Sequence, residues 1–246
     1  MNNKVDVFIS SQSFQEEDLR DKTVVIIDVL RASSTIATAL DHGAKGVISV
    51  ADMSDASKIS QNLDSSYYLL CGEKDGVKIE GYDLGNSPLD YTSEAVESKT
   101  IILNTTNGTK AIKRSGLARQ IVIGSFLNLQ AIVEHLAATD GDVALVCAGW
   151  RGSMALEDLL CAGNIIADLA NGEPQRAMQD GAKVAFGIYE KFGDDIEQVI
   201  RTSDYALRLQ GVVSDKDLSY CCQRNSKEVL PVMEEGIISD FYGKEE

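Results

Sequence analysis

Hydrophobic and polar positions follow two different periods along this chain. Short runs of β-branched and aliphatic residues, such as VVII at 24–27 and VALVC at 143–147, are typical of strands buried on both faces. Between these runs, apolar residues recur with helical spacing. The predicted strands span residues 5–9, 23–27, 47–50, 67–71, 100–103, 120–123 and 143–147. The predicted helices span residues 33–40, 54–63, 109–114, 128–136 and 153–170.

This alternation predicts an α/β protein with a layered α/β/α fold and a mainly parallel or mixed sheet. After Pro174 the pattern is helical, with about four segments and no convincing strand. We expect this helical C-terminal third to cover one edge or face of the sheet. With 246 residues, the chain is at the upper limit for one hydrophobic core. We therefore predict a single domain over residues 1–246, in which the part from about residue 172 forms either a second lobe or a helical cover.

The segment TVVIIDVLRASST, residues 23–35, carries the first candidate chemistry. Its apolar run ends at Asp28, and ligands of open α/β sheets bind beyond the carboxyl ends of such strands. Arg31 can bind an oxyanion, and the hydroxyls of Ser33 and Ser34 stand at the start of a helix. This combination indicates a phosphate-handling site. The structural alternative is that Asp28 caps a turn and Ser33 or Ser34 caps the helix.

The same kind of strand-to-helix junction occurs twice more. Residues 100–109 read TIILNTTNGT, and residues 142–153 read DVALVCAGWRGS. If three such junctions meet at one sheet edge, several backbone N–H groups and helix N-termini point at one anion. Ordinary turn chemistry produces similar residues without any ligand, so the repetition alone decides nothing.

Further polar residues stand at predicted turns and helix starts. Glu73 follows a strand, and Glu157 and Asp158 lie in the opening turns of a long helix, where acids are favoured by the helix dipole in any protein. Adjacent helical residues point about 100° apart, so at most one of Glu157 and Asp158 is expected to reach a metal directly. The candidate substrate-binding residues outside the first segment are Lys74, Asn86, Asn107, Thr109 and Arg151. Each of them could instead have only a structural role as a turn or cap residue.

Charge narrows the range of partners. The formal net charge of −15 argues against non-specific binding to nucleic acid and to anionic membranes, because both need a basic surface. A phosphorylated ligand would therefore need dedicated cations, either Lys and Arg side chains or a divalent metal. We expect a small anionic phosphorylated substrate, no nucleic acid and no membrane. The oligomeric state is open, and a homodimer is one option.

Cysteine usage and the N-terminal segment point to the cytoplasm. The five cysteines form no CxxC pair, which suits small buried side chains in a reducing compartment. The segment MNNKVDVFIS does not have the pattern of a signal peptide. No apolar run approaches the roughly 18 residues that span a bilayer. We therefore expect a cytoplasmic protein.

The candidate motifs together resemble one known family. IDVLRASST, GEKDG, GNSP, NGT and RGSMALEDLLCAG occur in the order and approximate spacing seen in the 2-phosphosulfolactate phosphatases of coenzyme M biosynthesis. The resemblance covers nearly the whole chain from about Val5. It implies a magnesium-dependent phosphatase that converts 2-phospho-3-sulfolactate to 3-sulfolactate, built on a distinctive α/β/α architecture. The chain departs from the family at residues 202–207, TSDYAL, where members often have a Ser-x-His segment.

The chemistry expected from the residues agrees with this resemblance. Phosphate monoesters hydrolyse so slowly in water that catalysis calls for charge neutralisation and exact positioning of the groups. Mg²⁺ prefers oxygen ligands and keeps several waters, so a few carboxylates are enough. The candidate catalytic residues are Asp28, Arg31, Glu157 and Asp158. The candidate magnesium ligands are Asp28, Glu73, Glu157 and Asp158.

Several alternatives stay open at this stage. Asp28 could attack phosphorus and form an aspartyl phosphate, or it could hold magnesium while a bound water attacks. Aspartate-nucleophile phosphatases usually have a second acid two residues on, where this chain has Leu30, which favours water. The substrate could be another phosphorylated hydroxy acid. The protein could also be a non-hydrolytic module that binds an organophosphate, and clustering of Asp28, Glu157 and Asp158 in one cleft would argue against that.

Overall fold

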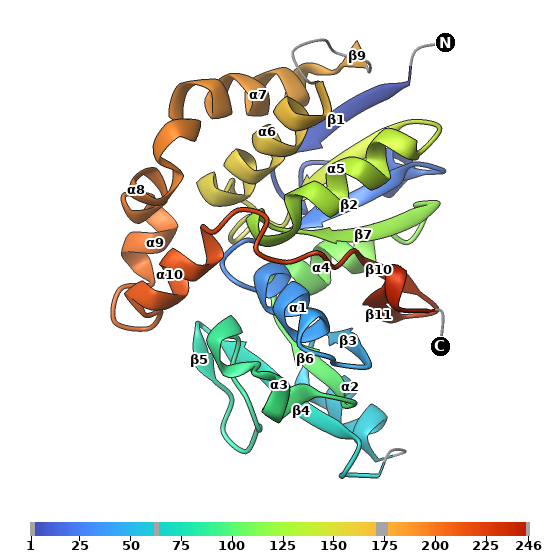
Figure 1. Ribbon diagram of the computed structural model, residues 1–246, viewed down its shortest axis with the longest axis vertical. Coiled ribbons are helices and arrows are strands. Elements are labelled where there is room, and N and C mark those ends of the chain that lie inside the picture. Colours follow the sequence, from blue (N-terminus) through green and yellow to red (C-terminus); the bar gives the residue numbers. More distant parts are fainter. Residues whose placement is uncertain (1–2, 62–63, 171–176, 245–246) are drawn as a thin grey trace.

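A twisted β-sheet runs through the computed structural model of the protein, which describes residues 3–61, 64–170 and 177–244 (Figure 1). Within these residues the sheet has eleven strands in the order β5-β4-β6-β3-β11-β10-β7-β2-β8-β1-β9. The strands are β1 (Lys4–Phe8), β2 (Thr23–Ile27), β3 (Gly46–Val50), β4 (Tyr68–Lys74), β5 (Val77–Lys78), β6 (Thr100–Asn104), β7 (Gln120–Gly124), β8 (Val143–Cys147), β9 (Ala177–Met178), β10 (Pro231–Glu234) and β11 (Ile237–Asp240). The α-helices are α1 (Ala32–Asp41), α2 (Met53–Ser60), α3 (Ser93–Val96), α4 (Asn107–Arg114), α5 (Leu129–Ala138), α6 (Leu156–Ala170), α7 (Asp180–Phe192), α8 (Ile196–Arg201), α9 (Asp204–Arg208) and α10 (Asp215–Cys221).

The sheet consists of two parallel sets of strands joined by a hairpin. One set is β4-β6-β3, and the other is β7-β2-β8-β1-β9. The β10–β11 hairpin pairs antiparallel with β7 on one side and with β3 on the other, where the register runs through Ile238 and Val47. In Figure 1 the two sets converge towards the middle of the molecule, and the hairpin lies between their diverging ends. The convergence brings strand ends from both sets together.

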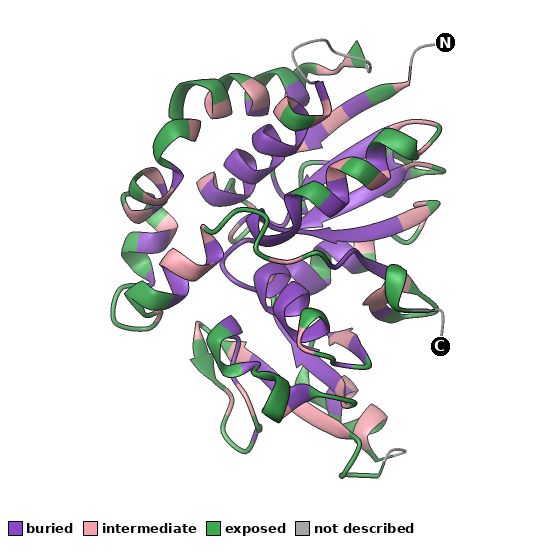
Figure 2. Cartoon of the chain, in the orientation of Figure 1, coloured by how far each residue is buried: buried purple, intermediate pink, exposed green. Residues whose placement is uncertain are grey.

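Helices on both faces bury the central strands. The five residues of β2 are all buried, and their side chains alternate between two cores. Val25 and Ile27 pack into the core formed with α5, α6 and α7, whereas Val24 and Ile26 pack into the core formed with α1 and α4. Figure 2 shows the central strands and the inner side of α6 as buried and the outer helices as largely exposed. The predicted α/β class with a layered architecture is confirmed.

The C-terminal third is helical but also contributes strands to the sheet. Helices α7 to α10 form an arm along one end of the molecule (Figure 1), and this agrees with the four expected segments. The expectation of no strand after Pro174 is wrong, because β9, β10 and β11 follow it. The β10–β11 turn at Glu235 and Gly236 has positive φ at both residues, the geometry of a tight two-residue hairpin. The expected boundary near residue 172 lies outside the described residues.

The structure also bears on the expectations for the cysteines and for membrane-spanning helices. All five cysteines are free; four are buried and Cys222 is half-buried, as expected of small apolar side chains. In the described part of the chain, no helix has the length and apolar character needed to cross a membrane.

Candidate active site

A small cleft lies where the two parallel sets of strands converge. Its walls come from the turn after β2, the end of β4, the turn after β6 and the helical arm. The cavity volume is about 20 Å³, the space of roughly one water molecule. The lining residues are Asp28, Leu30, Arg31, Glu73, Gly76, Asn86, Thr105, Thr106, Asn107, Tyr205, Leu209 and Val213.

Asp28 stands at the carboxyl end of β2 and is almost fully buried. The N–H of Ala32 donates to its Oδ1 at 3.4 Å. Gly108, in the first turn of α4, lies so close that an added Cβ would be 3.0 Å from Oδ2 of Asp28, so the two junctions touch. Burial raises the pKa of Asp28 from 3.8 to about 6, helped by the charge of Glu73 and opposed by the N–H groups of Ala32 and Gly108. This carboxyl group is therefore poised near neutral pH.

The start of α6 adds two buried carboxylates with different partners. Asp158 accepts N–H bonds from Val29 at 2.8 Å and from Gly149 at 3.0 Å, which ties the turn after β2 to the turn after β8. Glu157 is equally buried, and its Oε2 has no hydrogen-bond partner among the described residues. Burial and the charge of Asp28 raise the pKa of Glu157 from 4.5 to about 7. The adjacent acids thus point to different surroundings, as their helical positions predict.

Asp158 carries a raised pKa as well. Burial is the main cause, followed by the charges of Glu157 and Asp28, while the two backbone N–H groups oppose it. Neither Glu157 nor Asp158 lines the cleft, yet their charges act on Asp28 from the side of α6. Three carboxylates thus share one poorly solvated region, and a cation would relieve their mutual repulsion.

Arg31 is the cation on the cleft wall. It precedes α1, and the peptide bond between Leu30 and Arg31 is cis. Its guanidinium donates to Asp217 Oδ2 at 3.2 Å and to the Gly76 carbonyl oxygen at 3.1 Å. Since a guanidinium carries five N–H groups, these bonds leave several for an oxyanion in the cleft.

Asn86 and Glu73 complete the polar wall on the side of β4. Asn86 is buried, and its Oδ1 has no hydrogen-bond partner among the described residues. Glu73 accepts the N–H of Gly76 at 2.5 Å and lines the cleft beside Asp28. An unpartnered buried amide oxygen is costly, so a ligand or water in the cleft would satisfy it.

The helical arm closes the remaining side of the cleft. Tyr205, Leu209 and Val213 come from α9 and the segment after it. Asp217, in the first turn of α10, binds Arg31 and also accepts the Ser87 hydroxyl at 2.5 Å. This buried carboxylate fastens the arm to the two turns it covers.

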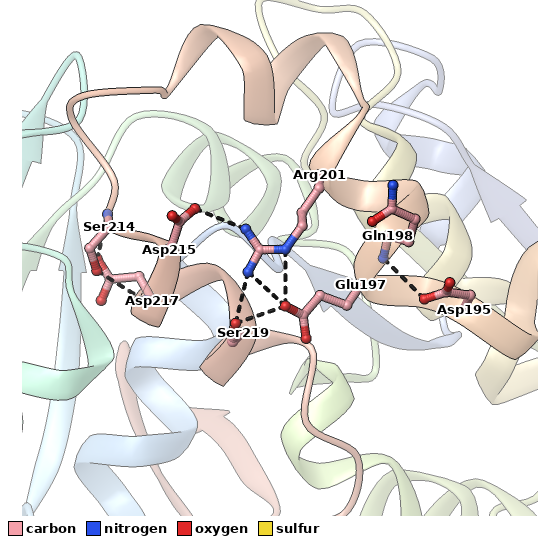
Figure 3. A network of polar contacts seen from close by, with 8 residues as sticks. All are labelled: Asp195, Glu197, Gln198, Arg201, Ser214, Asp215, Asp217 and Ser219. Atoms are coloured by element: carbon pink, nitrogen blue, oxygen red, sulfur yellow. Dashed lines mark hydrogen bonds and ion pairs between the residues drawn. The ribbon is translucent and has the colours of Figure 1, made fainter.

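Further polar contacts hold the helices of the arm to each other (Figure 3). Arg201 of α8 pairs with Glu197 at 2.7 Å and with Asp215 at 2.8 Å. Ser219 of α10 donates to Glu197 at 2.8 Å and is contacted by Arg201 at 2.9 Å. These bonds fix α10 against α8 and so fix where Asp217 meets the cleft.

A ready-made metal cage is absent from the described part of the chain, where no group of three or more His, Cys, Asp or Glu side chains is arranged to hold a metal ion by itself. Mg²⁺ needs less than a cage, since it is usually held by one or two carboxylates together with waters and substrate phosphate. The unpartnered Oε2 of Glu157 and the raised pKa of Asp28 fit such an ion. Asp158 fits less well, because both of its oxygens already accept backbone N–H groups.

Comparison with known proteins gives a consistent result. The family model described as 2-phosphosulpholactate phosphatase matches residues 8–236. The chain belongs to this family. Relatives named "Probable 2-phosphosulfolactate phosphatase" include those of Clostridium acetobutylicum, 38% identical over 96% of this chain and 99% of the relative, and of Clostridium tetani, 37% identical over 95% and 99%. That of Caldanaerobacter subterraneus subsp. tengcongensis is 36% identical over 92% of this chain and 93% of the relative.

As a member of this phosphatase family, the chain is a phosphoric monoester hydrolase. Five of its predicted site residues share the cleft wall: Asp28, Arg31, Glu73, Asn86 and Asn107. They come from the turn after β2, the end of β4, the loop after β5 and the start of α4. The junctions after β2 and β6 thus meet at this cleft, through Asp28 and Asn107.

The other residues that were predicted to bind substrate do not line the cleft of this phosphatase. The Ser33 hydroxyl accepts the N–H of Asp28 at 2.9 Å, and the Ser34 hydroxyl donates to the Val29 carbonyl at 2.9 Å, so both hold the turn after β2. Thr109 is buried with its hydroxyl 2.6 Å from that of Ser49. Lys74 and Arg151 are exposed and do not line the cleft. The guanidinium of Arg151 stacks on Trp150 instead, 4.7 Å from the ring centre.

Among the residues that the sequence analysis of this phosphatase did not single out are Tyr205, on the cleft wall, and Asp217, which binds Arg31. Asp217 is visible in the sequence as the fourth residue of SDKD, a capping box at the start of α10. That pattern predicts a helix start but not an ion pair with Arg31. Tyr205 lies in the segment TSDYAL, where the departure from the family pattern drew attention to a missing histidine and not to the tyrosine that is present.

Proposed function

We propose that this protein catalyses the Mg²⁺-dependent hydrolysis of 2-phospho-3-sulfolactate to 3-sulfolactate and phosphate. The names of its relatives support this substrate. The observation that carries the proposal is the clustering of Asp28, Glu157 and Asp158 beside the cleft that holds Arg31. A module that only binds an organophosphate has no use for three carboxylates in a poorly solvated region, since they repel its ligand.

The residues of the cleft divide the work between cation binding and anion binding. Asp28 and Glu157, with Glu73 beside them, would hold Mg²⁺, which when bound supplies charge neutralisation and Lewis-acid activation. Arg31 binds oxygens of the phosphoryl group through the N–H groups that Asp217 and Gly76 leave free. Asp158 keeps the turns after β2 and β8 in register and so orients Asp28.

The charge state of Asp28 suits a metal ligand. With a pKa of about 6, it is largely ionised at neutral pH and can hold the metal while a water attacks phosphorus. We favour this route over direct attack by Asp28 on phosphorus, because Leu30 occupies the position where aspartate-nucleophile phosphatases carry their second acid. The water oxygen then bonds to phosphorus as the ester bond to the sulfolactate oxygen breaks, and that oxygen takes up the proton that the attacking water releases.

Substrate entry requires movement of a cleft wall. The cavity of about 20 Å³ has space for roughly one water and not for a phosphorylated hydroxy acid. The part of the arm that lines the cleft, from α9 to α10, is joined to the other walls through side chains, among them Asp217 and the buried Ala206 and Leu218. We expect the arm to open for substrate entry and to close over the bound phosphoryl group.

A steady-state assay of the full chain tests the proposal. Phosphate release is measured with 2-phospho-3-sulfolactate, 2-phospholactate and 3-phosphoglycerate, each with Mg²⁺ and with excess chelator. We expect the highest kcat/KM for 2-phospho-3-sulfolactate and its loss in chelator, restored by added Mg²⁺. A higher kcat/KM for one of the other two esters would overturn the substrate. Saturable ester binding without phosphate release would overturn the enzymatic function, and full turnover in chelator would overturn the metal requirement.

A further inference from the structure

Tyr205 projects from the helical arm into the acidic side of the cleft. It lies on α9, whose N-cap Ser203 accepts the N–H of Ala206 at 3.1 Å. The ring packs against Trp150 with 6.0 Å between ring centres. Its pKa is raised, first by burial and then by nearby negative charges, those of Asp28, Glu157, Glu73 and Asp158. The phenol therefore faces the same carboxylates that surround the proposed phosphoryl site.

The hydroxyl of Tyr205 has no hydrogen-bond partner among the residues that the structure describes. Although Asp28 and Glu73 also line the cleft, neither carboxylate accepts a hydrogen bond from this hydroxyl. The hydroxyl can therefore donate to an acceptor inside the cleft, and an oxygen of a phosphoryl group is such an acceptor.

Tyr205 supplies a hydrogen-bond donor from the side of the arm. The other donors on the cleft wall, which are Arg31, Asn86, Thr105, Thr106 and Asn107, come from the strand ends and the loop after β5, whereas the arm's other lining residues, Leu209 and Val213, are apolar. A phenol with an ordinary pKa near 10 keeps its proton at neutral pH and donates it to an anion. Negative neighbours strengthen this preference for the neutral, donating form.

We infer that Tyr205 is a substrate-contacting residue whose hydroxyl donates a hydrogen bond to an oxygen of the phosphoryl group, opposite Arg31. This inference rests on the proposed function for the presence of a phosphate ester in the cleft. It gives the arm a chemical role beyond covering the site, because closing the arm brings the donor to the phosphate. Opening the arm removes the donor together with Leu209 and Val213.

The variant Tyr205→Phe tests the inference, since it keeps the ring against Trp150 and removes the hydroxyl. We expect kcat/KM for 2-phospho-3-sulfolactate to fall about tenfold or more, as for a lost hydrogen bond to a charged group. The inhibition constant of inorganic phosphate should rise by a similar factor, while the thermal midpoint stays close to that of the parent chain. Tyr220→Phe is the matched control, because its hydroxyl also belongs to the arm but contacts Thr38 at 3.2 Å outside the cleft.

Trp150 provides a second readout that does not depend on turnover. It is the one tryptophan of the chain and contacts Tyr205, so its fluorescence can follow inorganic phosphate binding to the full chain. We expect weaker phosphate binding in Tyr205→Phe and unchanged binding in Tyr220→Phe. Phosphate affinity and kcat/KM within twofold of the parent chain in Tyr205→Phe would overturn the inference. If the parent chain does not hydrolyse 2-phospho-3-sulfolactate but Tyr205→Phe still weakens phosphate binding, the inference stands and the proposed substrate falls.

Discussion

The strand-end half of the cleft and the arm half are built by different means. Around Asp28, backbone groups do the positioning, because Asp158 binds the N–H groups of Val29 and Gly149. The arm is held by side chains, in ion pairs such as that between Arg31 and Asp217. Backbone contacts to the sheet give a rigid set of carboxylates, whereas side-chain contacts give a wall that can separate. Mutations in the strand-end half should therefore cause large losses of catalysis. Mutations in the arm half should cause smaller effects that arise from changes in conformation.

The largest effect is expected at the rigid half, in Asp28→Asn. Loss of the charge should lower kcat by on the order of 10³-fold or more, the scale of an electrostatic or acid–base contribution. Folding should be preserved, because the amide retains an acceptor for the N–H of Ala32 and removes a poorly solvated charge. Steady-state kinetics and thermal unfolding of the same sample check both parts. Activity within tenfold of the parent chain would remove Asp28 from the chemistry.

Glu157→Gln should trade activity for stability. The folded protein binds the Glu157 proton with a pKa of about 7, against 4.5 for an ordinary glutamate, so its free energy of unfolding falls as pH rises between these values. Above pH 7, in chelator, the variant should therefore be more stable than the parent chain by up to about 3 kcal/mol. Near pH 4 the two should be equal. Denaturant unfolding at a series of pH values measures the difference, and a variant that is less stable at pH 8 would contradict the repulsion described here.

Arg31→Lys tests the contact between the two halves of the cleft, because Arg31 pairs with Asp217 of the arm. An ammonium cannot reproduce the planar fork that serves Asp217, Gly76 and an oxyanion together. We expect a loss of about 1.5–3 kcal/mol in transition-state binding, or roughly one to two decades in kcat/KM. If the loss is in KM, Arg31 binds the substrate throughout; if it is in kcat, the contact forms in the transition state. Parent-like kinetics in both Arg31→Lys and Arg31→Ala would make the residue purely structural.

The smallest effect is expected within the arm, in Ser214→Ala. This change removes the N-cap of α10, whose hydroxyl accepts the N–H of Asp217 at 3.1 Å. A lost cap costs about 1 kcal/mol of stability. Because Asp217 is positioned by this cap, kcat/KM should fall a few-fold while the carboxylate cluster stays intact. Ser203→Ala, at the cap of α9, is the comparison: a matching loss of stability with a different change in kcat/KM would separate the roles of the two helices.

Much of the fold could be predicted from the sequence because the signals are local. Apart from β9, the strands of the two parallel sets contain short apolar runs such as VVII, and their helices begin at recognisable junctions. The β10–β11 hairpin escaped prediction because the apolar residues of its segment, PVMEEGIISD, form only the short pairs VM and II, separated by two glutamates and a glycine. Its pairing with β7 and β3 depends on strands more than 100 residues away in the chain.

The candidate site divides in the same way. Asp28 directly follows β2, and Arg31 and Asn107 stand in or just after the turns that follow β2 and β6, so their meeting could be predicted from the rule that ligands bind at the carboxyl ends of strands. Ser33 and Ser34 are close in sequence to Asp28, yet which way each hydroxyl points depends on the local turn, and both point at backbone. Asp217 and Tyr205 could not be predicted, because only the packing of the arm brings residues more than 170 positions away to Arg31 and Asp28.

The position of the β10–β11 hairpin between the two parallel sets affects how the chain folds during its synthesis. β10 and β11 follow every other strand of the sheet in sequence, so they leave the ribosome after β3 and β7 have both been synthesised. Until then, β3 and β7 each present an unpaired edge, the kind of surface on which chains associate wrongly. The sheet is thus completed by its last-made strands, and a nascent chain that lacks them has no backbone pairing between its two half-sheets.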